Sequence, residues 1–432
     1  MHIVYIGLTL FALFFGAGNL IFPVMLGQQA GDSFLIAALG FVFTGVLLPL
    51  LGVIALAVSG EKDFLKVAQR PGKIFGMVFA TSLYLTIGPF FALPRTGSVS
   101  FEIILRPFIA EEQSSLYLAI FTIVYFGLAC LLAINPSKII DIVGKILTPI
   151  MLLFIVVLIT FSIFMPMSDG FTQPIKDYHS APFFTGFKEG YLTMDTLASF
   201  IFGIIVIYSI MGYGIRGRAR ILMDCIKASL VAALILGIIY ISLAYIGADS
   251  VGALGVLGNG GQVLAKVSVH YFNTSGNIIL GIIVTMACLT TSIGLINACS
   301  NYFHHLFPTI SYRVFAIIMS VFSAFVANIG LSQLIAISVP ILFIIYPISI
   351  VMIVLMFSHH LYKGKKAVYI GALYFTLLVS IFDGLNAAGF GVDYVNALFT
   401  QYLPLYTVGL GWIAPALLGG MLGYIYSKIS KH

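Results

Sequence analysis

The stretch LFALFFGAGNLIFP at Leu10–Pro23 constrains this chain more than any other. It lies in an apolar segment long enough to cross a membrane, and GAGN at Gly16–Asn19 interrupts that segment near its middle. Glycine lets a backbone leave helical geometry cheaply, but each unsatisfied N–H or C=O group in hydrocarbon costs several kcal/mol. Irregular backbone at this depth is tolerated where it lines a cavity or binds a solute. We therefore expect a carrier with a binding site in mid-membrane. The freed N–H groups suit a carboxylate and the freed carbonyls suit a cation.

Composition makes the chain a polytopic membrane protein. Of 432 residues, 60% are hydrophobic and only 8% are charged, too few charges to cover a soluble domain. The net charge of +6 comes from basic residues in short loops, and no folded domain offers a basic face for nucleic acid. The expected partners are therefore the lipid bilayer and a small solute.

Apolar runs of about 20 residues predict twelve membrane-spanning helices. We place them near residues 4–27, 33–58, 73–99, 115–134, 139–165, 187–213, 224–247, 276–301, 312–328, 332–357, 367–387 and 402–427. The segments 165–189 and 249–275 are expected to be long loops. Most of the 21 lysines and arginines fall in loops on one side, so the positive-inside rule predicts that both termini are cytoplasmic.

Five helices followed by five more suggest an inverted repeat, in which the first and sixth helices correspond. The expected units are residues 1–165, residues 166–357 and two additional helices in 358–432. The sixth helix should then also be broken, and it carries a carboxylate, Asp195, near its predicted midpoint. Asp195 could meet a cation, bind a substrate ammonium or cap the second half-helix. If the helix unwinds there, further binding groups come from Thr196, Leu197, Ala198 and Ser199.

Two other groups of polar residues have less specific patterns. Ala287, Thr290 and Thr291 in the eighth helix offer the oxygen ligands that hard cations such as sodium accept. Arg95, Glu102 and Arg106 are interpreted as charges at the membrane interface, and the last two are spaced for an i,i+4 pair. No catalytic constellation or phosphate-binding loop appears in the sequence, so we expect no enzyme and no cofactor.

Four motifs are similar to those of the branched-chain amino acid:cation symporter family. They are FFGAGNLIFP at Phe14–Pro23, LTIGPFFALPRT at Leu85–Thr96, EGYLTMDTLASFIFG at Glu189–Gly203 and ANIGLSQLIAISVPIL at Ala327–Leu342. The resemblance runs through essentially the whole chain. It implies import of leucine, isoleucine and valine with sodium across the bacterial inner membrane. It also implies an all-α, LeuT-type fold, with a 5+5 inverted repeat and two C-terminal helices.

The resemblance also implies roles for individual residues. Gly16–Asn19 corresponds to the unwound segment of LeuT-type carriers, so the amides of Ala17 and Gly18 would take the substrate carboxylate. Asn19 would serve a sodium site beside the substrate. A second sodium site would combine the eighth-helix residues Ala287, Thr290 and Thr291 with carbonyls of the first helix. The resemblance implies that Ala12 and Phe15 supply those carbonyls. It also implies that Tyr84 is a tyrosine that closes over the substrate.

Alternatives of other kinds stay open at this point. A carrier of the same fold for branched-chain or other small neutral amino acids could use protons, with Lys145 or Asp195 as the titrating group. A transporter of another small solute would not be inhibited by leucine. A channel would lack saturable, stoichiometric uptake, and an intramembrane enzyme would need a catalytic set that is missing. Stoichiometry, oligomeric state and preference among the three amino acids are not encoded in any recognisable motif.

Overall fold

The computed structural model describes residues 2–61, 63–134 and 138–430, with side chains left out over 138–148. Every regular element in this part of the chain is a helix. Eight helical segments are long and apolar enough to cross a membrane: Ala17–Ser59, Lys73–Phe108, Glu111–Ile134, Asp195–Gly212, Arg218–Leu254, Gly260–Leu306, Leu331–Ser358 and Lys366–Ala387. Three shorter apolar helices accompany them: His2–Phe14, Pro149–Phe164 and Tyr312–Ala327. The all-helical membrane fold is confirmed, and the count of twelve crossings stays a prediction.

The first helix is broken where the glycines predict. Helix α1 (His2–Phe14) ends before Phe15, and α2 (Ala17–Ala30) begins after Gly16. Gly16 has an extended backbone with φ −114° and ψ −166°, and as a glycine it has no side chain to cap the N–H groups of the first turn of α2. The first N–H groups of α2 therefore point, with the positive end of the helix dipole, into the gap between the two half-helices.

The sixth helix is also broken, but earlier than predicted. Helix α10 (Pro182–Glu189) continues into a short 3₁₀ turn, η7 (Gly190–Thr193), and α11 (Asp195–Gly212) follows. The joint is Met194, whose φ of 64° lies in the left-handed region. Thr196–Ser199, predicted to be able to unwind, lies inside the first turn of α11. Asp195 stands at the break itself.

The remaining helices of the N-terminal part include two with π-helical turns. The second predicted helix comprises α3 (Phe34–Val42), η2 (Phe43–Leu47) and α4 (Leu48–Ser59). The third comprises α6 (Lys73–Leu85), η3 (Thr86–Phe90) and α7 (Ala92–Ile104), with non-helical Gly88 inside η3. The others are η1 (Gly31–Ser33), α5 (Phe64–Ala68), η4 (Arg106–Phe108), η5 (Glu111–Gln113), α8 (Ser114–Ile134), α9 (Lys138–Phe164) and η6 (Lys176–His179).

In the second part of the chain, the predicted glycine-rich loop is mostly helical. Helix α12 (Arg218–Leu254) extends into it from one side, and α13 (Gly260–Leu306) begins inside it and bends at Asn273, which has φ 56°. Only about five residues between these helices lack helical structure, so the prediction of a long loop is wrong here. The later helices are α14 (Tyr312–Ala327), α15 (Leu331–Ser358), α16 (Lys366–Ala387), α17 (Asp393–Tyr402), η8 (Tyr406–Val408) and α18 (Ile413–Ile429).

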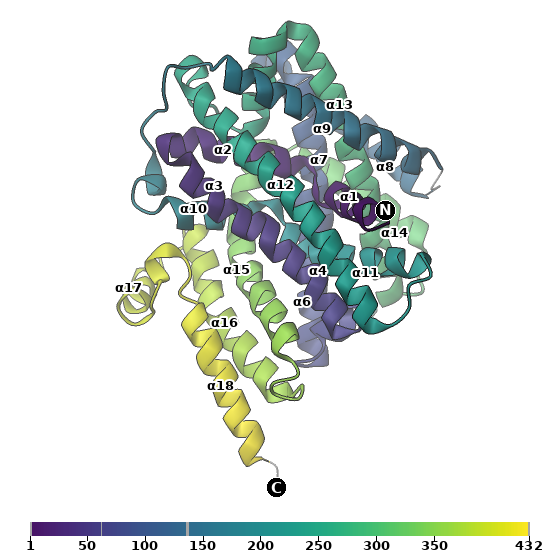
Figure 1. Cartoon of the computed structure of the whole chain (residues 1–432), viewed down its shortest axis with the longest axis vertical. Coiled ribbons are helices and arrows are strands. Elements are labelled where there is room, and N and C mark those ends of the chain that lie inside the picture. The colour runs from purple at the N-terminus through teal and green to yellow at the C-terminus, as the bar shows by residue number, and fades with distance from the viewer. Residues whose placement is uncertain (1, 62, 135–137, 431–432) are drawn as a thin grey trace.

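Close glycine contacts hold the broken first helix against α12. A Cβ built on Gly27 would lie 1.9 Å from the Ala244 carbonyl oxygen, and one on Gly247 would lie 1.9 Å from that of Val24. Only glycine permits backbones to approach this closely, as in other small-residue contacts of membrane helices. Figure 1 shows α16 and α18 side by side at one edge of the molecule, with α16 packed on α15. The C-terminal pair therefore lies at the edge of the bundle and joins it through α15.

Candidate substrate site

Both helix breaks open into one small cavity in the bundle. The cavity also touches the third and eighth predicted helices, so four helices contribute to its wall. Its lining residues are Leu13, Phe14, Gly16, Ala17, Gly18, Asn19, Ile87, Ala92, Arg95, Thr96, Thr193, Met194, Asp195, Ala198, Phe202, Thr291 and Leu295. We call it the central cavity.

The structure brings a subset of the predicted binding residues to the central cavity. Those that line it are Gly16, Ala17, Gly18, Asn19, Asp195, Ala198 and Thr291. Thr196, Leu197 and Ser199 are buried elsewhere in the packing. The Thr196 hydroxyl donates to the Thr44 carbonyl at 3.3 Å, and the Ser199 hydroxyl donates to the Thr196 carbonyl at 2.7 Å. These three side chains therefore support α11 from outside the cavity.

A buried polar network joins the two breaks. The Asn19 side-chain amide donates to Asp195 at 2.5 Å and also to the Tyr240 hydroxyl of α12. Tyr240 in turn donates to the same Asp195 carboxylate oxygen at 3.3 Å, and the Asn19 carbonyl oxygen accepts from Gly16 N–H at 3.3 Å. Tyr240 was missed by the sequence argument because a tyrosine inside an apolar run carries no distinguishing pattern. The network places a negative charge at the meeting point of α2 and α11.

The prediction that Arg95 lies at the membrane interface is wrong. Its side chain is only 2% exposed and lines the central cavity from α7. Nη1 donates to the Leu192 carbonyl of η7 at 2.5 Å, and the guanidinium lies 4.8 Å from the centre of the Phe22 ring. Nε and Nη2 have no hydrogen-bond partner among the described residues. The central cavity thus carries a buried positive charge as well as a negative one.

The two other charges grouped with Arg95 also have partners that the spacing did not predict. Arg106 lies 3.6 Å from Glu111 rather than forming the i,i+4 pair, and its Nη1 donates to the Ile109 carbonyl at 3.2 Å. Glu102 accepts instead from the Gln262 side chain at 3.4 Å. Helix α7 ends at Ile104 and Arg106 begins the 3₁₀ turn η4, so Arg106 lies outside the helix in which an i,i+4 pair would form.

One of the proposed cation ligands of the eighth helix, Thr291, lies next to the first break. The hydroxyls of Thr290 and Thr291 both donate to the Ala287 carbonyl, at 2.8 and 3.2 Å. A Cβ built on Gly16 would lie 3.5 Å from the Thr291 methyl carbon, so this threonine faces the break directly. The two first-helix residues that would complete the site, Ala12 and Phe15, do not line the central cavity.

Two further candidates lie away from this site. The Tyr84 ring stacks on Tyr302 with a centroid distance of 4.0 Å, and Tyr84 is not among the residues that line the central cavity. The structure therefore does not bring Tyr84 to the position of a lid. The side chain of Lys145, a candidate proton carrier, lies outside the described residues.

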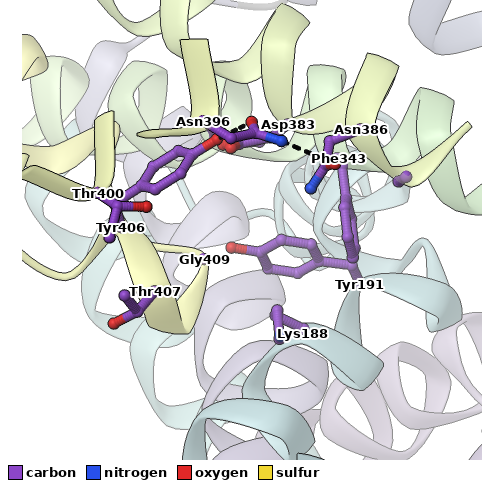
Figure 2. Close-up of a pocket in the computed structure, with 12 residues that line it drawn as sticks. Lys188, Tyr191, Phe343, Asp383, Asn386, Asn396, Thr400, Tyr406, Thr407 and Gly409 are labelled. Atoms are coloured by element: carbon purple, nitrogen blue, oxygen red, sulfur yellow. Dashed lines mark hydrogen bonds between the residues drawn. The ribbon is translucent and has the colours of Figure 1, made fainter. Parts of the chain in front are cut away.

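A second, larger cavity of about 320 Å³ lies between η7, α15 and the C-terminal helices (Figure 2). Tyr191 of η7 projects into it, with Lys188 and Asp383 among the other charged and polar lining residues. Tyr406 donates to Asn396 at 2.7 Å, and Asn396 donates to Asn386 at 3.0 Å along one wall. None of the predicted site residues lines this second cavity. The sequence argument missed it because its wall residues come from five separate segments.

Comparison with known proteins identifies the family. Residues 1–430 match the family model described as branched-chain amino acid transport protein. The chain belongs to this family. Among curated members, it is 54% identical to the branched-chain amino acid permease BrnQ of Bacillus subtilis, over 99% of this chain and 97% of that protein. It is 47% identical to the permease BraB of the same organism, over 98% and 94%. A branched-chain amino acid transport system 2 carrier protein of Pseudomonas aeruginosa is 40% identical, over 98% and 95%.

Solved structures place this family member in a known transporter fold. The inward-facing conformation of Mhp1 matches with a TM-score of 0.65 at 15% identity, covering 98% of this chain and 91% of that one. MhsT, solved in complex with L-phenylalanine, matches with a TM-score of 0.59 at 16% identity, covering 99% and 98%. The LeuT-type fold expected from the sequence is thereby confirmed. The relatives are named as permeases and carriers rather than enzymes.

Proposed function

We propose that this protein is a sodium-coupled importer of leucine, isoleucine and valine that works by alternating access. One observation carries the proposal: the breaks of the first and sixth helices meet at one buried cavity with a charge of each sign. An amino acid is a zwitterion with an apolar or polar side chain, and this cavity matches its charged part. The names of the relatives, branched-chain amino acid permeases, support the same substrate class.

The apolar part of the central cavity supports an aliphatic side chain. Among the lining residues are Leu13, Phe14, Ile87, Phe202 and Leu295. Such a wall favours leucine, isoleucine and valine over polar amino acids, whose side-chain groups would be left without partners. Discrimination among the three should be modest, since one methylene changes binding by only about 1–3 kcal/mol.

For the coupling ion, we propose sodium bound at the first break. Thr290 and Thr291 both direct hydroxyls toward the Ala287 carbonyl, and Thr291 lies against Gly16. Hydroxyl and carbonyl oxygens are suitable ligands for a hard cation. Carbonyls of Ala12 and Phe15, together with the amide oxygen of Asn19 at a second position, complete the set that the family resemblance implies.

Proton coupling is the second candidate, and the surroundings of Asp195 favour it. The buried Asp195 carboxylate accepts hydrogen bonds from the neutral groups of Asn19 and Tyr240 and forms none of the ion pairs found in the described residues. A carboxylate in such a setting is a typical proton carrier in transporters. In this alternative, the protein is a proton-coupled transporter of branched-chain or other small neutral amino acids.

The architecture supports movement of one half of the bundle against the other. We propose that residues 1–165 and 166–357 form the two inverted repeats, each with its broken first helix at the substrate. Residues 358–432 add the C-terminal pair, and both termini face the cytoplasm of a bacterial inner membrane. Rocking around the fixed central cavity would then open it alternately to each side.

Uptake by the purified protein in proteoliposomes tests the proposal and its alternative. Radiolabelled leucine is supplied with an inward sodium gradient at equal pH, or with an inward proton gradient without sodium. Accumulation driven by sodium alone supports the proposal, and accumulation driven by protons alone selects the second candidate. If leucine does not accumulate under either gradient, the substrate assignment is wrong. An excess of unlabelled valine or isoleucine should compete, whereas lysine should not.

A further inference from the structure

The guanidinium of Arg95 is a buried cation with unused donors. The side chain is 2% exposed, and of its donor nitrogens only Nη1 has a partner among the described residues, the Leu192 carbonyl at 2.5 Å. Nε and Nη2 lie on one edge of the planar group and are both without a partner there. This edge is the one that binds the two oxygens of a carboxylate in parallel hydrogen bonds.

A second positive feature adjoins the guanidinium. A Cβ built on Gly18 would lie 3.2 Å from Arg95 Nη1, so the charged group lies against the first turn of α2. The Asn19 side chain accepts from the Gly16 N–H, but no side chain of the described residues accepts from the N–H groups of Ala17 and Gly18, so this helix N-terminus carries a partial positive charge. The Phe22 ring, 4.8 Å from the guanidinium, supplies the only aromatic face beneath it in the described residues.

Neither positive feature forms a direct ion pair with a carboxylate of the described residues. Arg95 forms none of the ion pairs found in the described part of the chain. Asp195 lines the same cavity, but its Oδ2 accepts from Asn19 and Tyr240 instead. A buried charge without a directly bonded counter-ion is unfavourable, and an anion in the adjoining cavity would supply that partner.

We propose that Arg95 and the first turn of α2 form a carboxylate subsite that binds the α-carboxylate of the transported amino acid. The proposal rests on the function proposed above, and it adds Arg95 as the residue that recognises the substrate carboxylate. The Nε–Nη2 edge takes both carboxylate oxygens, and the N–H groups of Ala17 and Gly18 approach from the other side. Asp195, which lines the same cavity, is then left for the ammonium group.

The subsite predicts selectivity against ligands without a carboxylate. Leucinol has the side chain and amine of leucine and lacks only the acid group. In proteoliposomes of the wild-type protein, leucine should inhibit labelled valine uptake at about 100-fold lower concentration than leucinol, since each hydrogen bond to a charged group contributes about 1.5–3 kcal/mol. Arg95→Gln should shrink this ratio to a few-fold, and Arg95→Lys should leave an intermediate value.

Two additional variants separate binding from folding. Gly18→Ala keeps the charge of Arg95 but adds a Cβ 3.2 Å from Nη1 and 3.1 Å from the Phe22 ring, so it should also reduce the leucine preference. Arg106→Gln makes the same chemical change as Arg95→Gln at a partly exposed ion pair and should leave the ratio unchanged. A merely misfolded variant would lower uptake without changing the ratio. If Arg95→Gln does not fold, Arg95→Lys and Gly18→Ala decide the result.

The other possible occupant of the Arg95 subsite is an inorganic anion such as chloride. The same uptake assay distinguishes it from the substrate carboxylate. Replacement of chloride by gluconate should leave wild-type uptake unchanged, because the substrate itself brings the anion. Chloride dependence that disappears in Arg95→Lys would overturn the proposal, as would an unaltered leucine-to-leucinol ratio in the Arg95 variants. Either result leaves wild-type leucine uptake intact. Failure of the proposed function would appear instead as a wild-type protein that does not accumulate leucine.

Discussion

Asn19 donates a 2.5 Å hydrogen bond to Asp195, and this single contact joins the first turn of α2 to the first residue of α11. The two residues are far apart in the sequence and stand at the two helix breaks. Tyr240 reaches the same carboxylate from α12. The backbone irregularities that the membrane would otherwise penalise are therefore held by shared polar contacts.

Asp195→Asn should impair leucine binding by about 30-fold or more, because it removes the buried negative charge proposed to receive the ammonium group. The amide is nearly isosteric and can still accept from Asn19. Leucine affinity, measured by equilibrium binding to the purified protein, checks this. Asp249→Asn is the matched control, since Asp249 accepts from Ser162 and the Met167 N–H away from the central cavity. That variant should lower thermal stability and leave leucine affinity unchanged.

Thr291→Ala and Thr290→Ala should each raise the sodium concentration for half-maximal leucine uptake, by about 10-fold for one lost oxygen ligand. Thr291 should have the larger effect because it faces Gly16 at the break. Sodium titration of uptake in proteoliposomes measures the change. Thr285→Ala, on the same helix with a hydroxyl outside the proposed ligand set, should leave the titration unaltered. Unchanged sodium dependence in both variants would remove this cation site.

Ala17→Pro should abolish leucine uptake while the protein still folds. Ala17 is the first residue of α2, and proline fits the first position of a helix. The substitution removes one of the N–H groups proposed to bind the substrate carboxylate and inserts a ring at a buried position. Ala17→Ser retains the N–H group and should keep most of the uptake. Normal leucine transport by the proline variant would show that this N–H group is not used.

A contact near the end of α15 should be sensitive to pH. Arg70 donates to the Nδ1 atom of His359 at 3.2 Å, and the Tyr369 hydroxyl lies 2.9 Å from the same nitrogen. Burial, and next the Arg70 guanidinium, lower the pKa of His359 below its ordinary 6.5. Because folding lowers the pKa of His359, the folded state favours the neutral imidazole over the charged one. The resulting stabilisation of the folded state is present above pH 6.5 and is lost as the pH falls through the folded-state pKa.

The melting temperature of the purified protein should therefore decrease as the pH is lowered from about 8 to about 5. His359→Gln should weaken this dependence, since glutamine can accept from Arg70 without titrating. His305→Gln, at an exposed histidine, should behave like the wild type. Equal pH dependence in the wild type and in His359→Gln would contradict the assignment.

The features that could be predicted from the sequence are those that depend on nearby residues in the chain. The break at Gly16 follows from glycines inside an apolar run, and the need for a partner break follows from inverted symmetry. A carboxylate in hydrocarbon is costly enough that Asp195 could be singled out from the sequence. The family motifs extended the prediction to the fold, because the family that they resemble implies a LeuT-type architecture.

The parts that could not be predicted depend on how helices rotate against each other. Arg95 was assigned to the interface from its place in the third helix, but the kink at Gly88 turns its side chain into the cavity. The second break occurs at Met194, a residue that rarely adopts a left-handed backbone, so no local signal marked it. Tyr84 and Tyr240 have similar apolar surroundings in the sequence, and only packing places the second one in the polar network.

The four residues of η7 separate the central cavity from the second one. Tyr191 lines the second cavity, Thr193 lines the central one, and the Leu192 carbonyl between them accepts from Arg95. The segment is therefore a thin partition with a cavity on each face. Any displacement of this partition toward one cavity enlarges the other, so the volumes on its two sides are inversely linked.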